Sequence, residues 1–372
     1  MASPLFFTSA PPFPDDVPVA QIARISLEKL ANKDAQEAKA VFDACTSLGF
    51  FLLDLRGNSV GEELIKDVDA ALEATGETMD IGPRRENALH STYAQMLFWG
   101  IMKTKNGKPD RCEFYVVTQD DILHNPSRFC IKDDDPFHTH PFPNPPPIES
   151  RRHHLEGFVN RGQYAITLVL RAFSTQLGLP ENIFRERMQP DQSSGTIIRL
   201  IRSAPSLTPE EKRTGLVAHT DYGSITLLAN VTGGLQVLRP DADPSDERGW
   251  EYVKPEPGCL IVNIADAMVQ WTGGVLRSNM HRVNFVPGTQ ALVPRHSVAL
   301  LVRPQMDTRM SRIVGGRIPL VSEDGEDKAK RAEELKGLSA IVWERRKAMA
   351  LREGRDIMKS RGGRALQPLA AV

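Results

Sequence analysis

Between Thr196 and Val302 the chain is a succession of short β-rich runs, and this texture limits the fold more than any other feature of the sequence. The runs are TIIRLI, SITLLAN, GLQVL, WEYV, CLIVNI, MHRVNF and SVALLV, with turn-forming Gly, Pro, Asp and Asn residues between them. Short strands at this spacing are typical of a β-sandwich or a β-barrel. The sequence therefore predicts such a unit over this segment.

Helical periodicity is found on both sides of the β-rich segment. Apolar residues recur at helical spacing after Asp34, again in residues 64–72, and over most of residues 151–178. The charged segment from Glu326 onward also reads as a helix, whereas residues 77–150 show little regularity. The predicted organisation is an N-terminal helical and mixed region (1–195), a β-rich core (196–310) and a C-terminal helical region (311–372).

The charge of the chain is nearly balanced. In 372 residues, 46 basic and 47 acidic side chains leave a formal net charge of −1, so no strong field favours nucleic acid or an anionic membrane as a partner. No uncharged run is long enough to span a bilayer, and prolines interrupt the N-terminal apolar stretch, which does not read as a signal peptide. The four cysteines are scattered without a CxxC pair, as expected of reduced thiols. We expect a cytoplasmic protein that acts on a small molecule, and the sequence leaves its oligomeric state open.

Two residues of metal-binding type stand two positions apart at the end of a predicted strand. In VAHTDYGSITLL, His219 and Asp221 leave the strand on the same face, and the later strand MHRVNF offers His281 as a third ligand. Two imidazoles and one carboxylate leave the other positions of an octahedral ion open, as in non-heme iron(II) oxygenases. By itself, an HxD motif is common, and a buried histidine is more often a hydrogen-bonded core residue than a ligand.

A second pair of histidines, His138 and His140, offers another HxH motif. It lies in the proline-rich run PFHTHPFPNPPP, which is typical of a loop and does not favour a rigid metal site. We therefore give preference to the HxD motif.

An arginine and a serine form a companion motif in PRHSVALLV. Arg295 and Ser297 are two apart on an apolar strand, so both point to one side while Val298 and Leu300 point to the other. An arginine that faces the interior of a barrel needs an anion, and a guanidinium beside a hydroxyl suits the carboxylate of a short dicarboxylic acid. The alternative is a structural salt bridge to an Asp or Glu of the chain.

The order of HTDYGSITLL, GLQV, IVNIAD, SNMHRV and RHS resembles that of the 2-oxoglutarate and Fe(II)-dependent oxygenase superfamily. The resemblance is to the branch shared with isopenicillin N synthase and many natural-product hydroxylases, and it is strongest over residues 196–303. It implies an α+β fold whose catalytic core is a double-stranded β-helix, or jelly roll, flanked by N-terminal and C-terminal helices. It also implies that iron is held by His219, Asp221 and His281, and that Arg295 and Ser297 bind 2-oxoglutarate.

The activity implied by the resemblance is that of a dioxygenase acting on a small secondary metabolite. Its cofactors would be Fe(II), 2-oxoglutarate and O2, with ascorbate as a candidate stimulant, and it would release succinate and CO2. The oxidation is a hydroxylation, a desaturation or a ring rearrangement. Two alternatives are an oxoacid-independent non-heme iron oxidase of the same fold and a non-catalytic jelly-roll binding module.

The chain departs from the family pattern just before the HxD motif. Members often carry a Tyr-Pro pair there, whereas this chain has Ser203 and Ala204, so the tyrosine contact is lost or replaced and Ser203 becomes a candidate oxoacid-binding residue. The resemblance also puts Asn263 and Asp266 beside the metal, where each either orients a ligand or closes the turn, and the turn is favoured for Asp266. Gln236 is expected in a pocket wall.

Substrate-binding residues are expected outside the metal motifs. The run TYAQMLFWGIMK would expose Phe98 and Trp99 unless they pack over the pocket, although the same residues would equally plug the edge of the core. Arg202 is a candidate partner for an acidic group of the substrate, and Phe285 is a candidate wall residue. The helix from Glu326 is expected to cover the open end of the barrel, as a lid or as a partner interface.

Overall fold

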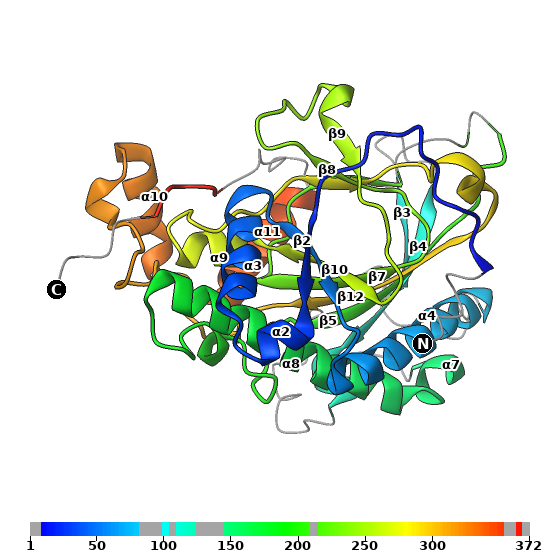
Figure 1. The fold of residues 1–372 in the computed structure, drawn as a ribbon, viewed down its shortest axis with the longest axis horizontal. Coiled ribbons are helices and arrows are strands. Elements are labelled where there is room, and N and C mark those ends of the chain that lie inside the picture. Colours follow the sequence, from blue (N-terminus) through cyan, green and yellow to red (C-terminus); the bar gives the residue numbers. More distant parts are fainter. Residues whose placement is uncertain are drawn as a thin grey trace.

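The larger of two β-sheets runs through the whole molecule (Figure 1). The computed structural model describes residues 9–81, 99–103, 109–123, 144–208, 211, 215–352 and 362–366. In spatial order the large sheet contains β1 (Ala23–Ser26), β2 (Phe50–Asp54), β10 (Cys259–Ile264), β7 (Ile225–Asn230), β12 (Arg295–Val302), β5 (Ile197–Ser203), β4 (Pro109–Thr118) and β3 (Trp99–Lys103). Strands β1 and β2 are parallel, and all other neighbouring pairs are antiparallel.

The smaller sheet closes the barrel. It contains, in order, β6 (Leu216–His219), β11 (His281–Val283), β8 (Leu235–Leu238) and β9 (Trp250–Tyr252). Leu235 and Val237 of this sheet pack against Phe50, Leu52 and Ile261 of the large sheet, so the two sheets face each other. The predicted α+β fold, a jelly roll flanked by helices, is confirmed.

Helices cover the outer face of the large sheet. Figure 1 shows α4 and α8 along this face, with α3 beside α8. The α-helices are α2 (Leu27–Ala31), α3 (Ala35–Ser47), α4 (Ser59–Ile81), α6 (Gln119–Ile122), α7 (Pro146–Glu149), α8 (Arg152–Leu177), α9 (Asp266–Trp271), α10 (Glu326–Lys336) and α11 (Ala340–Arg352). Because strand side chains alternate between faces, Ile198, Leu200, Val298 and Leu300 point into this helical layer and form the main core.

Local sequence signals set the ends of the helices. The Asp34 side chain caps α3 by accepting a hydrogen bond from the Glu37 N–H at 2.9 Å. Only this half of a capping box forms, because the Glu37 carboxylate accepts instead from the N–H of Ser26. Helix α8 ends at Gly178, which is left-handed with φ 66°, a conformation that glycine adopts without strain. None of the helices among the described residues combines the length and apolarity needed to cross a membrane.

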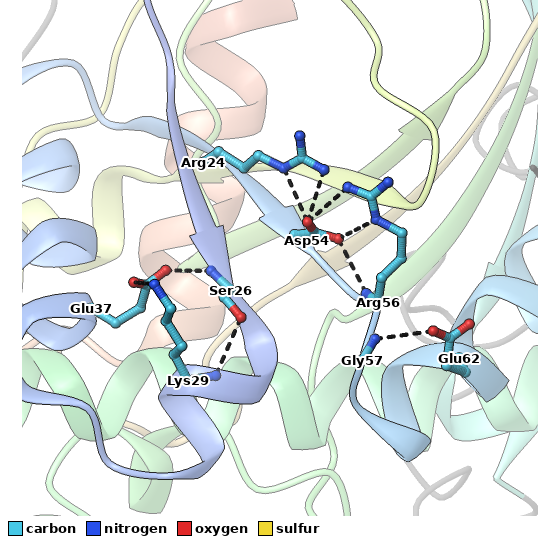
Figure 2. Close-up of polar contacts among 8 residues, drawn as sticks. All are labelled: Arg24, Ser26, Lys29, Glu37, Asp54, Arg56, Gly57 and Glu62. Carbon is cyan, nitrogen blue, oxygen red and sulfur yellow. Dashed lines mark hydrogen bonds and ion pairs between the residues drawn. The ribbon is translucent and has the colours of Figure 1, made fainter. Parts of the chain in front are cut away.

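The N-terminal segment joins the barrel through its own strands. Strands β1 to β4 all belong to the large sheet, so the sheet is built from residues on both sides of position 196. At its edge, the carboxylate of Asp54 accepts hydrogen bonds from Arg24 and Arg56 (Figure 2). The division of the chain into three regions stays a prediction.

Candidate metal centre and its pocket

His219, Asp221 and His281 come together at one end of the smaller sheet. His219 ends β6, Asp221 follows two residues later, and His281 begins β11 directly opposite His219 in the antiparallel register. One potential ligand atom from each residue lies within 4.8 Å of the other two. Nε2 of His219 is 3.6 Å, and Nε2 of His281 is 3.7 Å, from Oδ1 of Asp221. Within the described part of the chain, no other group of three His, Cys, Asp or Glu side chains is found at this spacing.

Hydrogen bonds fix which atoms of the three side chains face one another. Nδ1 of His219 lies 2.8 Å from the carbonyl of Val217, and Nδ1 of His281 lies 3.1 Å from the carbonyl of Asn279. An Nδ1–H that donates to a carbonyl leaves Nε2 with a free lone pair, which is the form that binds a metal. Both Nε2 atoms therefore face Asp221 as acceptors.

The Asp221 carboxylate is held in a similar way. Its Oδ2 atom accepts hydrogen bonds of 2.8 Å from Asn263 and from Thr226, so Oδ1 is the atom left for the two imidazoles. Burial alone would raise the pKa of Asp221, but His281, His219 and Asn263 together hold it well below its usual range. Asn263 thus orients Asp221, one of the two roles expected for it.

Burial keeps His281 neutral. It lowers the pKa of His281 to about 4, and repulsion from His219 acts in the same direction. The ring of Phe50 meets His281 edge-on at a centroid distance of 5.5 Å, which restricts rotation of the imidazole. The group therefore presents two imidazole nitrogens and one carboxylate oxygen in a fixed arrangement.

Asp266 supports this arrangement from behind. Its backbone N–H donates to the carbonyl of Asp221 at 2.8 Å, and its buried carboxylate accepts from Thr220, Ser278 and, at 2.8 Å, Lys347 of α11. Asp266 thus closes the turn, as favoured from the sequence. Through Lys347 it also links α11 to the segment that carries Asp221. No residue of α10 or α11 lines the pocket described next, among the residues the structure describes.

A pocket extends from the three residues between the two sheets, with about 770 Å³ of space including its open mouth. Its walls are mainly apolar, as in most small-molecule sites. The lining consists of Phe50, Cys112, Phe114, Arg199, Ile201, Leu216, His219, Asp221, Thr226, Leu228, Leu235, Asn263, His281, Val283, Arg295, Ser297, Ala299 and Leu301.

Arg295 and Ser297 are both in this lining, on the inner face of β12. Arg295 is 2% exposed; it donates from Nε to the carbonyl of Gly233 at 2.8 Å and from Nη1 to the hydroxyl of Ser297 at 3.0 Å. Burial lowers the pKa of Arg295 to about 10, so it remains charged at neutral pH. Gly234, with φ 109°, lets the backbone pass close to the guanidinium stem: a Cβ there would lie 3.4 Å from Cδ and Nε of Arg295.

No carboxylate of the described residues pairs with Arg295. Its two hydrogen-bond partners are the carbonyl and the hydroxyl just named. The structural salt bridge that would explain a buried arginine is therefore not found within the described part of the chain. Ser203 lies next to Arg295 in the register of β5 and β12, and its hydroxyl is 3.6 Å from Sγ of Cys112.

Two of the predicted substrate residues, Arg202 and Phe285, do not line the pocket. Arg202 lies on the outer face of β5, where it binds Glu113 at 2.8 Å and also Asp80 of α4. Its position follows from strand alternation: residue 202 points away from the face that carries residues 199, 201 and 203. Phe285 is not in the lining, and its carbonyl accepts a hydrogen bond from the Tyr252 hydroxyl.

The remaining expectations concern Phe98, the pair His138 and His140, Trp99 and Gln236. Phe98 lies outside the described residues, as do His138 and His140. Trp99 begins β3, but its side chain lies outside the description. Gln236 is not a wall residue of the pocket, because its side chain bonds Arg282 and Asn284 instead.

Two site residues were not anticipated from the sequence. Thr226 holds Asp221, and Arg199 lines the pocket. Thr226 was detectable as a polar residue inside the apolar strand ITLLAN, five positions after Asp221. Arg199 is two residues from Ile201 on the inner face of β5, but the run IIRLIR has no regular alternation from which its face can be read.

Comparison with known proteins agrees with this geometry. Residues 196–304 match the family model described as the 2OG-Fe(II) oxygenase superfamily. A protein of Aspergillus fumigatus named as a 2-oxoglutarate-dependent dioxygenase is 27% identical over 315 residues, which cover 79% of this chain and 78% of the relative. The 2-oxoglutarate-dependent dioxygenase frbH of Dothideomycetidae sp. is 26% identical over 81% of this chain and 87% of its own length.

A solved structure has the same fold. A full-length Neurospora crassa protein, crystallised in complex with alpha-KG, superposes with a TM-score of 0.65 at 20% identity, covering 90% of this chain and 99% of that one. The chain therefore belongs to the 2OG-Fe(II) oxygenase superfamily, and it is an oxidoreductase that uses iron(II), 2-oxoglutarate and dioxygen.

Proposed function

We propose that this dioxygenase oxidises a small organic molecule, with His219, Asp221 and His281 as its iron ligands and Arg295 with Ser297 as its 2-oxoglutarate site. One observation carries the proposal. The three potential ligand atoms, within 4.8 Å of one another, line the same pocket as a buried arginine without an acidic partner among the described residues.

The donor set fits iron(II). Two imidazole nitrogens and one carboxylate oxygen would hold an ion and leave its other positions open, which is the donor chemistry of non-heme iron(II) sites. The hydrogen bonds from Asn263 and Thr226 to Asp221, and those between the imidazoles and backbone carbonyls, pre-orient the donors. Little reorganisation is then needed when the ion binds.

Arg295 supplies the charge for the oxoacid. When bound, iron(II) and 2-oxoglutarate supply the oxidation of the substrate by dioxygen, with succinate and carbon dioxide as products. Arg295 would donate charge-assisted hydrogen bonds to the distal carboxylate, and Ser297, whose hydroxyl accepts a hydrogen bond from Arg295, would offer that hydroxyl to the same group. Ser203, beside Arg295 in the register, is the third candidate for this site.

The apolar walls define the class of substrate. Leu216, Leu228, Leu235 and Leu301 exclude water and fit a molecule with an apolar body, which supports a small secondary metabolite. The Neurospora crassa protein has also been crystallised with thymine and with 5-formyluracil, so this fold admits small organic molecules. The position of the substrate decides between hydroxylation, desaturation and ring rearrangement.

Paired measurements of oxygen and succinate test the proposal. The purified protein is supplied with iron(II), 2-oxoglutarate and a library of small metabolites, and both oxygen consumption and succinate release are followed. We expect succinate to form in proportion to the oxygen consumed. An Asp221→Ala protein that remains folded should neither consume oxygen nor release succinate.

The other outcomes distinguish the alternatives. Oxygen consumption without succinate would identify an oxoacid-independent oxidase and contradict the role of Arg295. If the protein takes up iron and 2-oxoglutarate but neither consumes oxygen nor forms succinate across the library, it is a binding module and the proposal fails.

A further inference from the structure

A second arginine lines the pocket. Arg199 lies in the middle of β5, where it pairs in register with Val116 of β4 and Ala299 of β12. Its guanidinium carbon lies 5.1 Å from the centroid of the Phe114 ring, which is also in the lining. The cation therefore rests on an aromatic platform inside the barrel.

The guanidinium of Arg199 has no hydrogen-bond acceptor among the described residues. Its Nε atom is sealed from solvent and makes no hydrogen bond. Burial lowers the pKa of Arg199, which is the expected effect of taking a charge out of water. A partly buried cation whose Nε is sealed from solvent without an acceptor is costly unless an anion joins it.

Two buried arginines outside the pocket lining, Arg282 and Arg303, have a structural role and are paired with acidic side chains. Arg282 donates to Glu247 at 3.0 Å and to Gln236 at 2.8 Å. Arg303 lies 3.8 Å from the carboxylate of Glu344 and donates to the Tyr222 hydroxyl at 3.0 Å. Both have acidic partners, whereas no described residue forms an ion pair with Arg199.

With iron(II) and 2-oxoglutarate bound, the positive charge of Arg199 would have no negative charge to balance it in the described lining of the pocket. Apart from the imidazoles, the charged side chains in the described lining are Arg199, Asp221 and Arg295. Iron(II) and Arg295 together offset Asp221 and a doubly negative oxoacid. The single positive charge of Arg199 therefore remains for another ligand.

Arg199 also stands too far along the sheet to share the oxoacid carboxylate with Arg295. Residue 203 is the register partner of Arg295 on β5, and it lies four residues from Arg199. At roughly 3.3 Å per residue, the two positions are about 13 Å apart along the strand. The two arginines therefore serve two different anionic groups.

We propose that Arg199 binds a carboxylate of the oxidised substrate, so that the enzyme acts on a small carboxylic acid with an apolar body. The proposal rests on the proposed function, in which 2-oxoglutarate occupies the site at Arg295. One guanidinium balances one carboxylate, whereas a phosphate monoester brings up to two charges at neutral pH. The leucine and isoleucine side chains around Arg199 suit the remainder of such an acid.

Binding of acids and their esters tests this assignment without turnover. The protein is loaded anaerobically with iron(II) and 2-oxoglutarate and titrated calorimetrically with phenylacetate, cinnamate and decanoate, each beside its methyl ester. The variants are Arg199→Leu, Arg199→Met and Arg199→Lys. The matched control is Arg202→Leu, because Arg202 is on the same strand but on the outer face, paired with Glu113.

We expect at least one acid to bind the wild type and the Arg202→Leu control about tenfold or more tightly than its ester. Arg199→Leu and Arg199→Met lose this preference, and Arg199→Lys keeps part of it. If Arg199→Leu does not fold, the result for Arg199→Met, which keeps an unbranched side chain, decides. The affinity for 2-oxoglutarate stays unchanged in all three variants.

Three results would overturn the proposal. The first is a wild type that binds no acid more tightly than its ester. The second is an uncharged Arg199 variant that keeps the preference. The third is loss of 2-oxoglutarate binding in the Arg199 variants, which would assign this arginine to the oxoacid. A wild type that fails to bind 2-oxoglutarate at all would instead contradict the proposed function.

Discussion

At the edge of the large sheet, Arg24 and Arg56 both donate hydrogen bonds to the carboxylate of Asp54 (Figure 2), whereas Arg199 and Arg295 inside the barrel meet no carboxylate of the described residues. The two edge arginines are partly exposed, and both pair with the carboxylate of Asp54. Arg295 is buried and Arg199 partly buried, and neither has an ion-pair partner among the described residues, which is a cost that a bound anion offsets. The difference supports the proposal that anionic ligands bind at the inner face.

The largest expected effect concerns the metal centre on that inner face. His281→Ala removes one of three donors, so we expect loss of iron binding and of succinate formation while the far-UV circular dichroism spectrum is retained. Iron content after gel filtration and a succinate assay measure this. His154→Ala is the control, because His154 pairs with Asp67 on α4 and takes no part in the pocket. Full activity in His281→Ala would remove His281 from the ligand set.

An intermediate effect is expected at Glu344, which joins α11 to the barrel through Arg303. Burial raises the pKa of Glu344 to about 7 from 4.5, while Arg303 opposes the shift. Between pH 4.5 and about 7, the folded protein therefore holds a proton that the unfolded chain releases. The contribution of Glu344 to the free energy of unfolding is complete below pH 4.5 and is lost as the pH rises through about 7.

Glu344→Gln should abolish this pH dependence and stabilise the protein at pH 8 by about 1–3 kcal/mol. Urea unfolding at pH 5 and at pH 8 measures it. Glu333→Gln serves as the control, because Glu333 lies on α10 in an exposed pair with Lys336. An unchanged difference between the two pH values in Glu344→Gln would show that Glu344 is ionised in the folded protein.

The smallest expected effect is at the edge cluster. Arg24 is 45% exposed, so Arg24→Ala should lower the free energy of unfolding by only about 0.2–1 kcal/mol, and less at high salt. Urea unfolding at low and high ionic strength checks this. A loss as large as that of a core truncation would mean that the edge cluster holds the fold together, and the comparison with the inner face would weaken.

The sequence predicted the inner-face motifs because strand side chains alternate with a period of two. His219 with Asp221, and Arg295 with Ser297, are each two apart, and both pairs reach the same pocket. The jelly roll was equally accessible from the short β-rich runs and their turns. These features depend on local spacing, which a sequence displays directly.

Features that depend on strand phase or on distant contacts were not predictable. In IIRLIRS, Arg199 and Arg202 are three apart and so point to opposite faces, and only the register with β12 shows which one faces inward. The prediction that Arg202 contacts the substrate is not supported, because Arg199, and not Arg202, lines the pocket. Similarly, nothing local indicates that Lys347 reaches Asp266 across 81 positions. Such contacts arise from the packing of whole elements.

The affinity of 2-oxoglutarate for the iron-loaded protein tests the central claim most directly. Anaerobic calorimetric titrations compare the wild type with Arg295→Leu and Arg24→Leu. We predict that Arg295→Leu loses on the order of 2–5 kcal/mol of binding free energy at unchanged iron affinity, whereas Arg24→Leu binds like the wild type. Wild-type affinity in Arg295→Leu, or an equal loss in both variants, would contradict the account.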